Sequence, residues 1–174
     1  MEIRALRAAD NRSKFHSGDP DLDGFFLKFA GQNQFRHYLG VTYIAFEKQQ
    51  IIAYATVAPG CVEIDDLPAI SRKKLPQYPL PVIRLARLAV DSSAQGQGVG
   101  RELLKFVLNL AVRMSVEYGC IGVLVDAKLE AVEFYKKHGF IQIDVLEGRS
   151  EVRPAQMPMF LAIRAVRTAL GKIR

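Results

Sequence analysis

The sequence has few of the residues from which metal sites and disulfide frameworks are built. Its 174 residues include two cysteines, three histidines and no tryptophan. Cys61 and Cys120 lie far apart and form no C-x-x-C pair, which predicts free thiols in a reducing cytoplasm. Because no H-E-x-x-H motif and no paired C-x-x-C motif are present, we expect no metal in the site.

Long apolar runs are also missing. No stretch approaches the roughly 20 apolar residues that a membrane-spanning helix requires. Charged residues interrupt the apolar positions at the start of the chain, which is not typical of a signal peptide. We therefore expect no membrane partner and a cytoplasmic location. The length favours a single domain over residues 1–174.

Positive charge exceeds negative charge, with 24 lysines and arginines against 18 acidic residues and a formal charge of +6. Such an excess indicates either a solvated surface or a polyanionic partner, which could be a phosphate-rich cofactor or nucleic acid. Charge by itself leaves these alternatives open. The basic side chains gather in four groups, the last in a tail from about residue 164: Arg72, Lys73 and Lys74; Arg84 and Arg87; Lys136 and Lys137; and Arg164, Arg167, Lys172 and Arg174.

The hydrophobic periodicity predicts one α/β domain on a mixed sheet, in the order β-α-β-β-β-α-β-α-β-β. Asp19 followed by Pro20 predicts the start of the first helix, which carries an aromatic stripe at Phe25, Phe26 and Phe29. The stripe indicates core packing. The expected strands include residues 3–6, 41–47, 51–58, 82–90, 120–127 and 157–163, and the later helices cover residues 103–118 and 129–140 and the basic tail.

A glycine-rich turn, Q-G-Q-G-V-G at residues 95–100, stands between an apolar strand and a long amphipathic helix. Unpaired N–H groups and the positive end of the helix dipole meet at such a place and attract anions. Glycines let phosphate oxygens approach the backbone, although a flexible corner would also be rich in glycine. The pattern is Q-x-x-G-x-G. It lacks the third glycine of a dinucleotide-binding loop, where Arg101 stands, and the G-K-[ST] of a Walker loop.

Several parts of the sequence resemble the GNAT acetyltransferase superfamily, in order and at that family's usual spacing. They are the strand R-L-A-R-L-A-V, the turn Gln95-x-x-Gly98-x-Gly100 with the helix behind it, the strand I-G-V-L-V-D-A, and the helix A-V-E-F-Y-K-K-H-G-F. The resemblance covers residues 3–163 and is most specific over 84–140. It implies an α/β fold with a mixed, mostly antiparallel central sheet, one splayed pair of strands and helices on both faces.

A closer resemblance is to the GNAT toxins of bacterial toxin–antitoxin pairs, of the TacT/AtaT type. It rests on F-x-x-G-x-x-x-L-x-x-F from Phe15 to Phe25, on L-x-R-L-A-V-D at residues 85–91, and on A-x-x-F-Y-x-x-x-G-F at residues 131–140. Ser17 stands where several such proteins carry cysteine. The resemblance implies acetylation of the α-amine of aminoacyl-tRNA, a homodimer, and a ribbon-helix-helix antitoxin as partner.

The resemblance also implies which residues bind acetyl-CoA as co-substrate. The turn would hold the pyrophosphate, and the backbone of the preceding strand would pair with the pantetheine arm. Lys128 stands where many GNATs carry an asparagine near the cofactor. The implied cofactor residues are Leu88, Ala89, Val90, Gln95, Gly96, Gln97, Gly98, Val99, Gly100, Arg101 and Lys128.

Tyr135 is the catalytic acid that the resemblance implies. A phenol with a pKa of about 10 can lend a proton to a thiolate whose acid has a pKa of about 8.5. An N–H near Val90 can polarise the thioester carbonyl. Phosphates of tRNA would meet five basic residues, unless these are merely solvated or ion-paired: Arg72, Lys73, Lys74, Arg84 and Arg87.

No general base is obvious, and Glu63, Asp65 and Asp66 are candidates by position only. An α-amine has a pKa of about 7.7–8.0, so a sizeable fraction is already neutral near pH 7, whereas a lysine amine would need a base. The missing base therefore favours an α-amine substrate. A GNAT that acetylates a small-molecule or protein amine, and a non-catalytic regulator that binds acyl-CoA, remain as alternatives.

Overall fold

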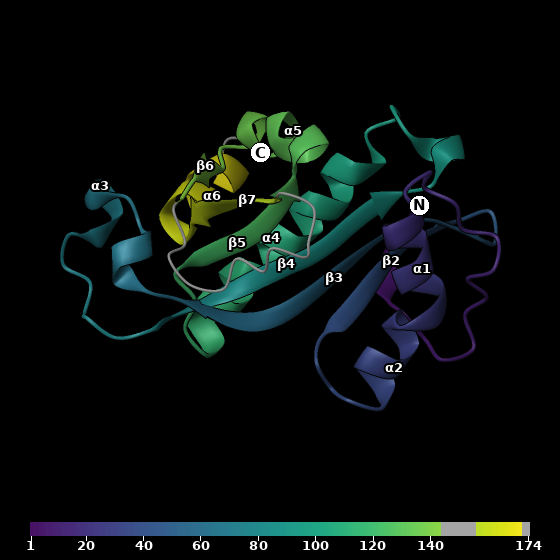
Figure 1. The fold of residues 1–174 in the computed structure, drawn as a ribbon, viewed down its shortest axis with the longest axis horizontal. Helices are drawn as coiled ribbons and strands as arrows, with labels where there is room; N and C mark the ends of the chain where they lie inside the picture. Colours follow the sequence, from purple (N-terminus) through teal and green to yellow (C-terminus); the bar gives the residue numbers. More distant parts are fainter. Residues whose placement is uncertain (144–155, 172–174) are drawn as a thin grey trace. The chain divides into compact units, whose positions relative to one another are not determined.

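The computed structural model describes residues 1–143 and 156–171. These fall into two compact units, one of residues 1–58 and 85–109 and one of residues 59–84, 110–143 and 156–171. The elements, labelled in Figure 1, are β1 (Glu2–Ala5), α1 (Pro20–Lys28), α2 (Ala30–Phe35), β2 (Val41–Glu47), β3 (Gln50–Val62), α3 (Ala69–Arg72), β4 (Leu80–Val90), α4 (Val99–Glu117), β5 (Gly122–Lys128), α5 (Val132–Lys137), β6 (Ile141–Gln142), β7 (Gln156–Ala162) and α6 (Ile163–Gly171).

The strands of the described residues form one seven-stranded sheet in the order β1-β2-β3-β4-β5-β7-β6. In the first unit, β1 pairs antiparallel with β2 and β2 with β3, with Ile3 opposite Ala45 and Val41 opposite Val57. In the second, β7 pairs antiparallel with both β5 and β6. These pairings confirm the predicted α/β class and the mostly antiparallel sheet. The splayed strand pair remains a prediction.

The core of the first unit lies under α1, which packs on the sheet through two phenylalanines. Asp19 caps the helix by accepting hydrogen bonds from the N–H groups of Asp21 and Leu22, and Pro20 occupies the first turn, as predicted. Phe26 is fully buried and stacks on Tyr54, with ring centroids 4.3 Å apart. The core cluster also includes residues of β2, β3 and β4: Ile44, Ile51 and Ala89.

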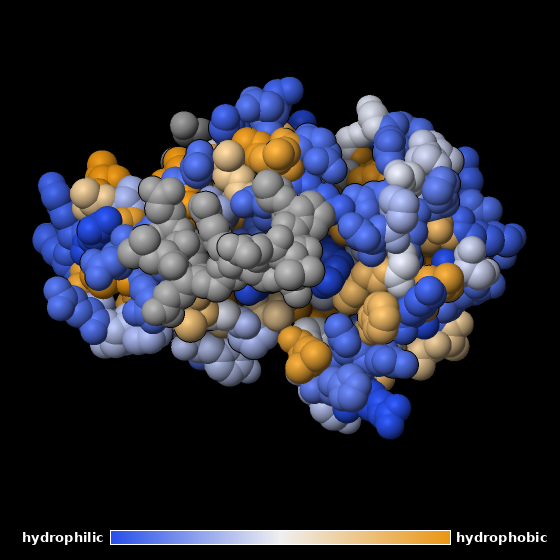
Figure 2. All heavy atoms as spheres, in the orientation of Figure 1, coloured by the Kyte–Doolittle hydropathy of each residue, from blue (hydrophilic) through white to orange (hydrophobic). Residues whose placement is uncertain are grey.

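The second unit has its own core, formed where β4 and β5 meet the loop that follows β3. Leu67, Leu80 and Val82 pack with Leu124 and Phe160. On the face that Figure 2 shows, hydrophobic side chains form small separate groups in a hydrophilic surface, as expected when most apolar residues lie in the cores.

Three details of the predicted fold were wrong. The structure has a second helix, α2, directly after α1, and its sequence A-G-Q-N-Q-F shows no apolar periodicity. Phe29 ends α1 and is 51% exposed, so it does not join the aromatic core. The helix predicted over 129–140 is a 3-10 turn, Leu129–Ala131, followed by the short α5. The basic tail is helical in α6, while Lys172 and Arg174 lie outside the described residues.

Candidate active site

The glycine turn has the backbone geometry that an anion site requires. Gly96 and Gly98 have φ angles of +75° and +81°, a conformation that residues with a Cβ rarely adopt. The N–H of Glu102 donates to the carbonyl of Gly98 at 3.1 Å, which starts the hydrogen-bond ladder of α4. The N–H groups of Val99, Gly100 and Arg101 therefore have no partner within the helix. They form an electropositive helix end directly after the turn.

Asp91, at the end of β4, fixes the start of this turn. Its carboxylate accepts hydrogen bonds from the N–H of His16 at 2.9 Å, from the N–H of Ser93 at 3.0 Å and from the Ser93 hydroxyl at 2.6 Å. Burial raises the pKa of the Asp91 carboxyl, but these hydrogen bonds outweigh it and the net shift is downward. Asp91 thus stays ionised at neutral pH and ties the turn to the chain before α1.

Gln95 makes the second connection between the turn and the segment before α1. Its amide Nε2 donates to the carbonyl of Ser17 at 2.8 Å and to the carbonyl of Val90 at 3.0 Å. The N–H of Ser92 donates to the carbonyl of His16 at 2.8 Å. We call His16 and Ser17 the turn anchor. The glutamine of the Q-x-x-G-x-G pattern therefore holds the loop in shape through its side chain.

Asp23 of α1 holds the turn anchor in place. Its carboxylate accepts hydrogen bonds from the Ser17 N–H at 2.8 Å and the Ser17 hydroxyl at 2.6 Å, and it lies 2.9 Å from Nδ1 of His16. Burial raises the pKa of Asp23, but the hydrogen bonds from Ser17 and the contact with His16 bring it below its ordinary value. A chain of polar contacts thus runs from α1 through the anchor to the glycine turn.

The other predicted cofactor residues of the first unit lie along the end of β4 and the turn. Ala89 is only 4% exposed and its side chain belongs to the core, so only its backbone is available to a ligand. Leu88 and Val90 are half-buried, and Gly96, Gln97, Gly98 and Arg101 are exposed. Gln97 donates to the carbonyl of Ser93 at 3.0 Å.

Tyr135 belongs to the second unit, where α5 buries its ring. The side chain is 5% exposed and lies edge-on to Phe134 and Phe140, with ring centroids 5.2 and 5.3 Å away. Burial raises the pKa of Tyr135 above the ordinary value of a phenol. Its hydroxyl is protonated at neutral pH and is a weaker acid than an exposed phenol. Lys128, also in the second unit, occupies the N-cap position of the 3-10 turn that precedes α5, without a capping hydrogen bond from its side chain.

The predicted tRNA contacts have different environments. The Arg72 guanidinium donates to the carbonyls of Leu67 and Asp65 at 2.5 and 3.0 Å, so it also holds its own loop. Lys73 and Lys74 are exposed. Arg84 forms an ion pair with Asp126, a partner that sequence reasoning missed.

Arg87 differs from the other basic candidates because its guanidinium carbon lies 3.7 Å from the centroid of the Phe25 ring, in a cation–π contact within the first unit. Sequence reasoning missed this contact. Both residues belong to motifs already noted, Phe25 to the F-x-x-G-x-x-x-L-x-x-F pattern and Arg87 to L-x-R-L-A-V-D. Their pairing links α1 to the strand that leads into the glycine turn.

The acidic residues considered as a general base lie in and beside the 3-10 turn Ile64–Asp66. Glu63 and Asp65 are exposed, and the Asp65 carboxylate is 3.9 Å from the Arg72 guanidinium. Within residues 1–143 and 156–171, no group of three or more His, Cys, Asp or Glu side chains is arranged to hold a metal ion. None of the helices in the same residues combines the length and apolar character that crossing a bilayer requires.

Comparison with known protein families decides the assignment. The model of the acetyltransferase (GNAT) domain matches residues 39–142, which include β2 to β5, the glycine turn, α4 and α5. The chain belongs to the GNAT acetyltransferase family.

Similar GNAT proteins include toxins. A tRNA-acetylating toxin of Mycobacterium tuberculosis (strain ATCC 25618 / H37Rv) is 34% identical over 140 residues, which cover 79% of this chain and 82% of that protein. A structure of AtaT complexed with acetyl-methionyl-tRNAfMet is 28% identical, with a TM-score of 0.84 over 97% of this chain and 98% of that one. A mutant AtaT toxin bound to the C-terminus of the antitoxin AtaR and acetyl-CoA is 26% identical, with a TM-score of 0.77 over 98% of this chain and 97% of that one.

These similarities confirm the predicted GNAT fold and the resemblance to GNAT toxins. The sequence did not reveal that the GNAT turn is tied to the segment before α1. The motifs quoted above contain both Asp91 and the segment from Phe15 to Phe25. Their occurrence in the same sequence is the signal that could have indicated this connection. Contacts such as Gln95 to Ser17 join residues 78 positions apart, so only the fold brings them together.

Proposed function

We propose that this chain transfers the acetyl group of acetyl-CoA to the α-amine of an aminoacyl-tRNA and thereby blocks translation. The observation that carries the proposal is the glycine turn, fixed by Asp91 and Gln95 at the N-terminus of α4, in a chain 34% identical to a tRNA-acetylating toxin. The turn indicates acetyl-CoA as the acetyl donor, and the similarity to tRNA-acetylating toxins indicates aminoacyl-tRNA as the acceptor.

The turn suits the pyrophosphate of acetyl-CoA. Positive φ at Gly96 and Gly98 bends the backbone. The N–H groups at the start of α4 point along the helix axis toward its N-terminal end, where the turn lies. Apart from the adjacent residues in the chain, no heavy atom lies within 4 Å of where a Cβ on Gly96 or Gly98 would be, so both positions border open space. The implied cofactor residues Leu88 to Val90 would pair through their backbone with the pantetheine arm. Lys128 stays a proposed cofactor contact.

Tyr135 is proposed as the acid. Acetyl transfer forms a carbon–nitrogen bond to the amine and breaks the carbon–sulfur bond of the thioester, so the sulfur leaves as a thiolate that takes up a proton. A phenol is protonated near neutral pH, so the Tyr135 hydroxyl can give that proton. The amine loses a proton as the amide forms. A free α-amine is partly neutral near pH 7, so the substrate needs no strongly basic side chain.

The basic residues are proposed to position the acceptor end of tRNA by its phosphates, without reading its sequence. Lys73 and Lys74 are exposed, as are Arg72 and Arg84, and a lysine side chain can bind a phosphate as a point charge. Arg72, Arg84 and Arg87 also make contacts within the protein, so their replacement would change both the surface charge and the local structure.

We further propose an antitoxin partner of the ribbon-helix-helix type and a homodimer in solution. The structure of a mutant AtaT with the C-terminus of AtaR supports the antitoxin partner. The dimer follows from the resemblance to GNAT toxins, and light scattering at micromolar concentration tests it. Since charged tRNA is a cytoplasmic substrate, the proposed activity places the protein in the cytoplasm.

Labelled acetyl-CoA tests the function directly. The protein is incubated with total charged tRNA and, in parallel, with the same tRNA after deacylation. We expect label in the charged sample only, bound to the aminoacyl group. If the protein binds acetyl-CoA but neither tRNA sample becomes labelled, the proposal is contradicted and another amine is favoured as the acceptor.

A further inference from the structure

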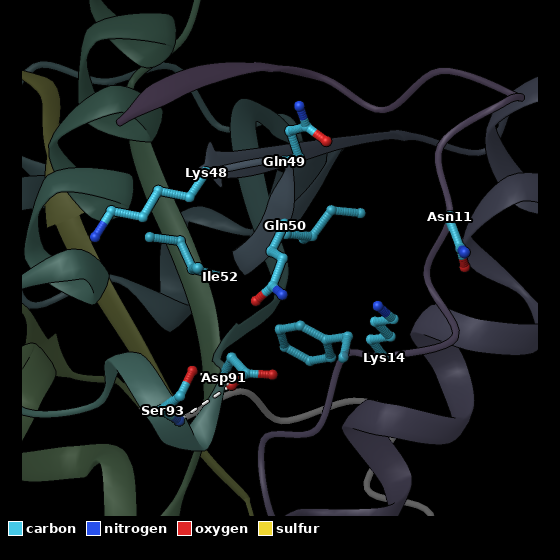
Figure 3. Close-up of a pocket in the computed structure, with 10 residues that line it drawn as sticks. Asn11, Lys14, Lys48, Gln49, Gln50, Ile52, Asp91 and Ser93 are labelled. Atoms are coloured by element: carbon cyan, nitrogen blue, oxygen red, sulfur yellow. Dashed lines mark hydrogen bonds between the residues drawn. The ribbon is translucent and has the colours of Figure 1, made fainter.

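A polar pocket of about 280 Å³ lies in the first unit, beside the residues that begin the glycine turn. Figure 3 shows it between the turn of the β2–β3 hairpin and the segment that precedes α1, with Lys48 and Lys14 on different sides. Asp91 and Ser93 line it next to the turn. Neither the proposed pyrophosphate site nor the basic residues discussed above account for it.

The charges of the lining favour an anion. Lys14 and Lys48 are exposed cations, and Asp91 is the carboxylate among the lining residues. That carboxylate already accepts hydrogen bonds from His16 and Ser93. Because the two cations come from different elements, the pocket suits a ligand with anionic groups at two ends.

The rest of the lining can hold a planar group between those ends. Phe15 and Ile52 contribute half-buried apolar surface. Gln50 points toward Asp91 in Figure 3, and its amide can both donate and accept hydrogen bonds. Aromatic surface combined with cations is what nucleotide-binding sites present to base and phosphate.

The hairpin turn at the edge of the pocket has an unusual sequence for its geometry. Lys48 and Gln49 both have positive φ angles, +48° and +62°. A two-residue turn of this kind strongly favours Asn-Gly, because residues with longer side chains are strained there. Backbone strain of this type is concentrated at functional sites. Lys48 and Gln49 therefore place two long polar side chains at a position where they lower the stability of the turn.

We propose that this pocket binds one nucleoside that carries phosphates on its 3′ and 5′ sides, with Lys14 and Lys48 as the phosphate contacts. Two ligands of the proposed function contain this unit: the 3′-phosphoadenosine part of acetyl-CoA, and any internal nucleotide of tRNA. The inference rests on the proposed function for these sources. Binding is measured without turnover, so a chain that failed to acetylate tRNA would still report on the pocket.

The test compares two double variants that lose the same charge. Lys14→Gln with Lys48→Gln removes both cations of the pocket, and Lys28→Gln with Arg36→Gln removes two exposed cations elsewhere in the first unit. The affinity of each for adenosine 3′,5′-bisphosphate is measured by calorimetry. We expect the pocket variant to bind at least about tenfold more weakly than wild type and the control within about twofold, since each charged hydrogen bond to phosphate is worth about tenfold or more. Equal affinity in the two variants would overturn the proposal.

The source is then identified with acetyl-CoA, its 3′-dephospho form and deacylated tRNA. If the pocket holds the cofactor, the pocket variant weakens binding of acetyl-CoA by a larger factor than binding of the dephospho form, which has lost the 3′-phosphate and keeps only the 5′ side. If it holds tRNA, only the tRNA affinity falls. A separate variant, Lys48→Asn with Gln49→Gly, should raise the melting temperature and weaken bisphosphate binding. A gain in stability with unchanged affinity would show that the turn residues do not serve the ligand, and would overturn the role of Lys48.

Discussion

Gln95→Ala should weaken acetyl-CoA binding without unfolding the protein. The side chain donates to the carbonyls of Ser17 and Val90 at 2.8 and 3.0 Å, and both bonds are lost in the variant. A hydrogen bond contributes about 0.5–1.5 kcal/mol net, and the exposed position of Gln95 favours the lower end. Without both bonds the turn is less ordered in the free protein, and ordering it when acetyl-CoA binds costs about 1–2 kcal/mol. The Kd for acetyl-CoA should therefore rise by about 5- to 30-fold.

Gln97→Ala is the matched control, because the same residue type lies two positions further along the same turn. Its amide donates to the carbonyl of Ser93 at 3.0 Å, whereas the bond to Ser17 belongs to Gln95. Its replacement should raise the Kd by less than about threefold, since one local bond within the turn is lost. Isothermal calorimetry with acetyl-CoA measures both variants. A Kd for Gln95→Ala within twofold of wild type would refute the reasoning that the turn must be tied to Ser17.

Three further predictions address the turn and the core. Gly98→Val should reduce the affinity for acetyl-CoA by about tenfold or more, and Gly98→Asn by less, since asparagine tolerates the positive φ of +81° better. If calorimetry finds that Gly98→Val binds acetyl-CoA as tightly as wild type, the turn is not part of the cofactor site. The pKa values of Asp91 and Asp23 lie below their ordinary 3.8, so the stability that these carboxylates confer is present above pH 3.8 and is lost as the pH falls through their folded-state pKa values. Urea titrations between about pH 2 and 6 should show this loss of stability in acid, and the loss should be smaller in Asp23→Asn. Phe26→Ala should lower the free energy of unfolding by about 3–5 kcal/mol and the exposed Phe29→Ala by about 1 kcal/mol or less, and equal losses would contradict the core assignment.

Local patterns were enough to predict much of the fold. Asp19 before Pro20 located the start of α1, since a capping carboxylate and a proline at the first helical position act within a few residues. Alternating apolar residues located the β2–β3 hairpin. The pattern missed α2, whose A-G-Q-N-Q-F sequence has no apolar stripe and which is placed by its contacts with α1 and β2. Phe29 was misassigned because a helical stripe does not show where the helix ends.

The candidate site was only half visible in the sequence. Gly96 and Gly98 predict a sharp bend of the backbone, and both residues have positive φ angles in the structure. The polar ties among Ser17, Asp91 and Gln95 were not predictable, since each is an ordinary loop residue until the fold brings it to its partner. The nucleotide pocket was hidden for the same reason, because its cations come from segments 34 positions apart, at Lys14 and Lys48.

In the proposed reaction the acetyl group goes to the α-amine of an aminoacyl-tRNA, with Tyr135 as the acid. The direct measurement is mass spectrometry of the aminoacyl-adenosine released by ribonuclease from charged tRNA, after timed incubation with acetyl-CoA and either wild type or Tyr135→Phe. Wild type should add one acetyl group to the aminoacyl nitrogen, and the variant should bind acetyl-CoA normally but turn over about 10²- to 10⁴-fold more slowly. Unmodified aminoacyl-adenosine with wild type, or near-normal turnover with Tyr135→Phe, would contradict the account.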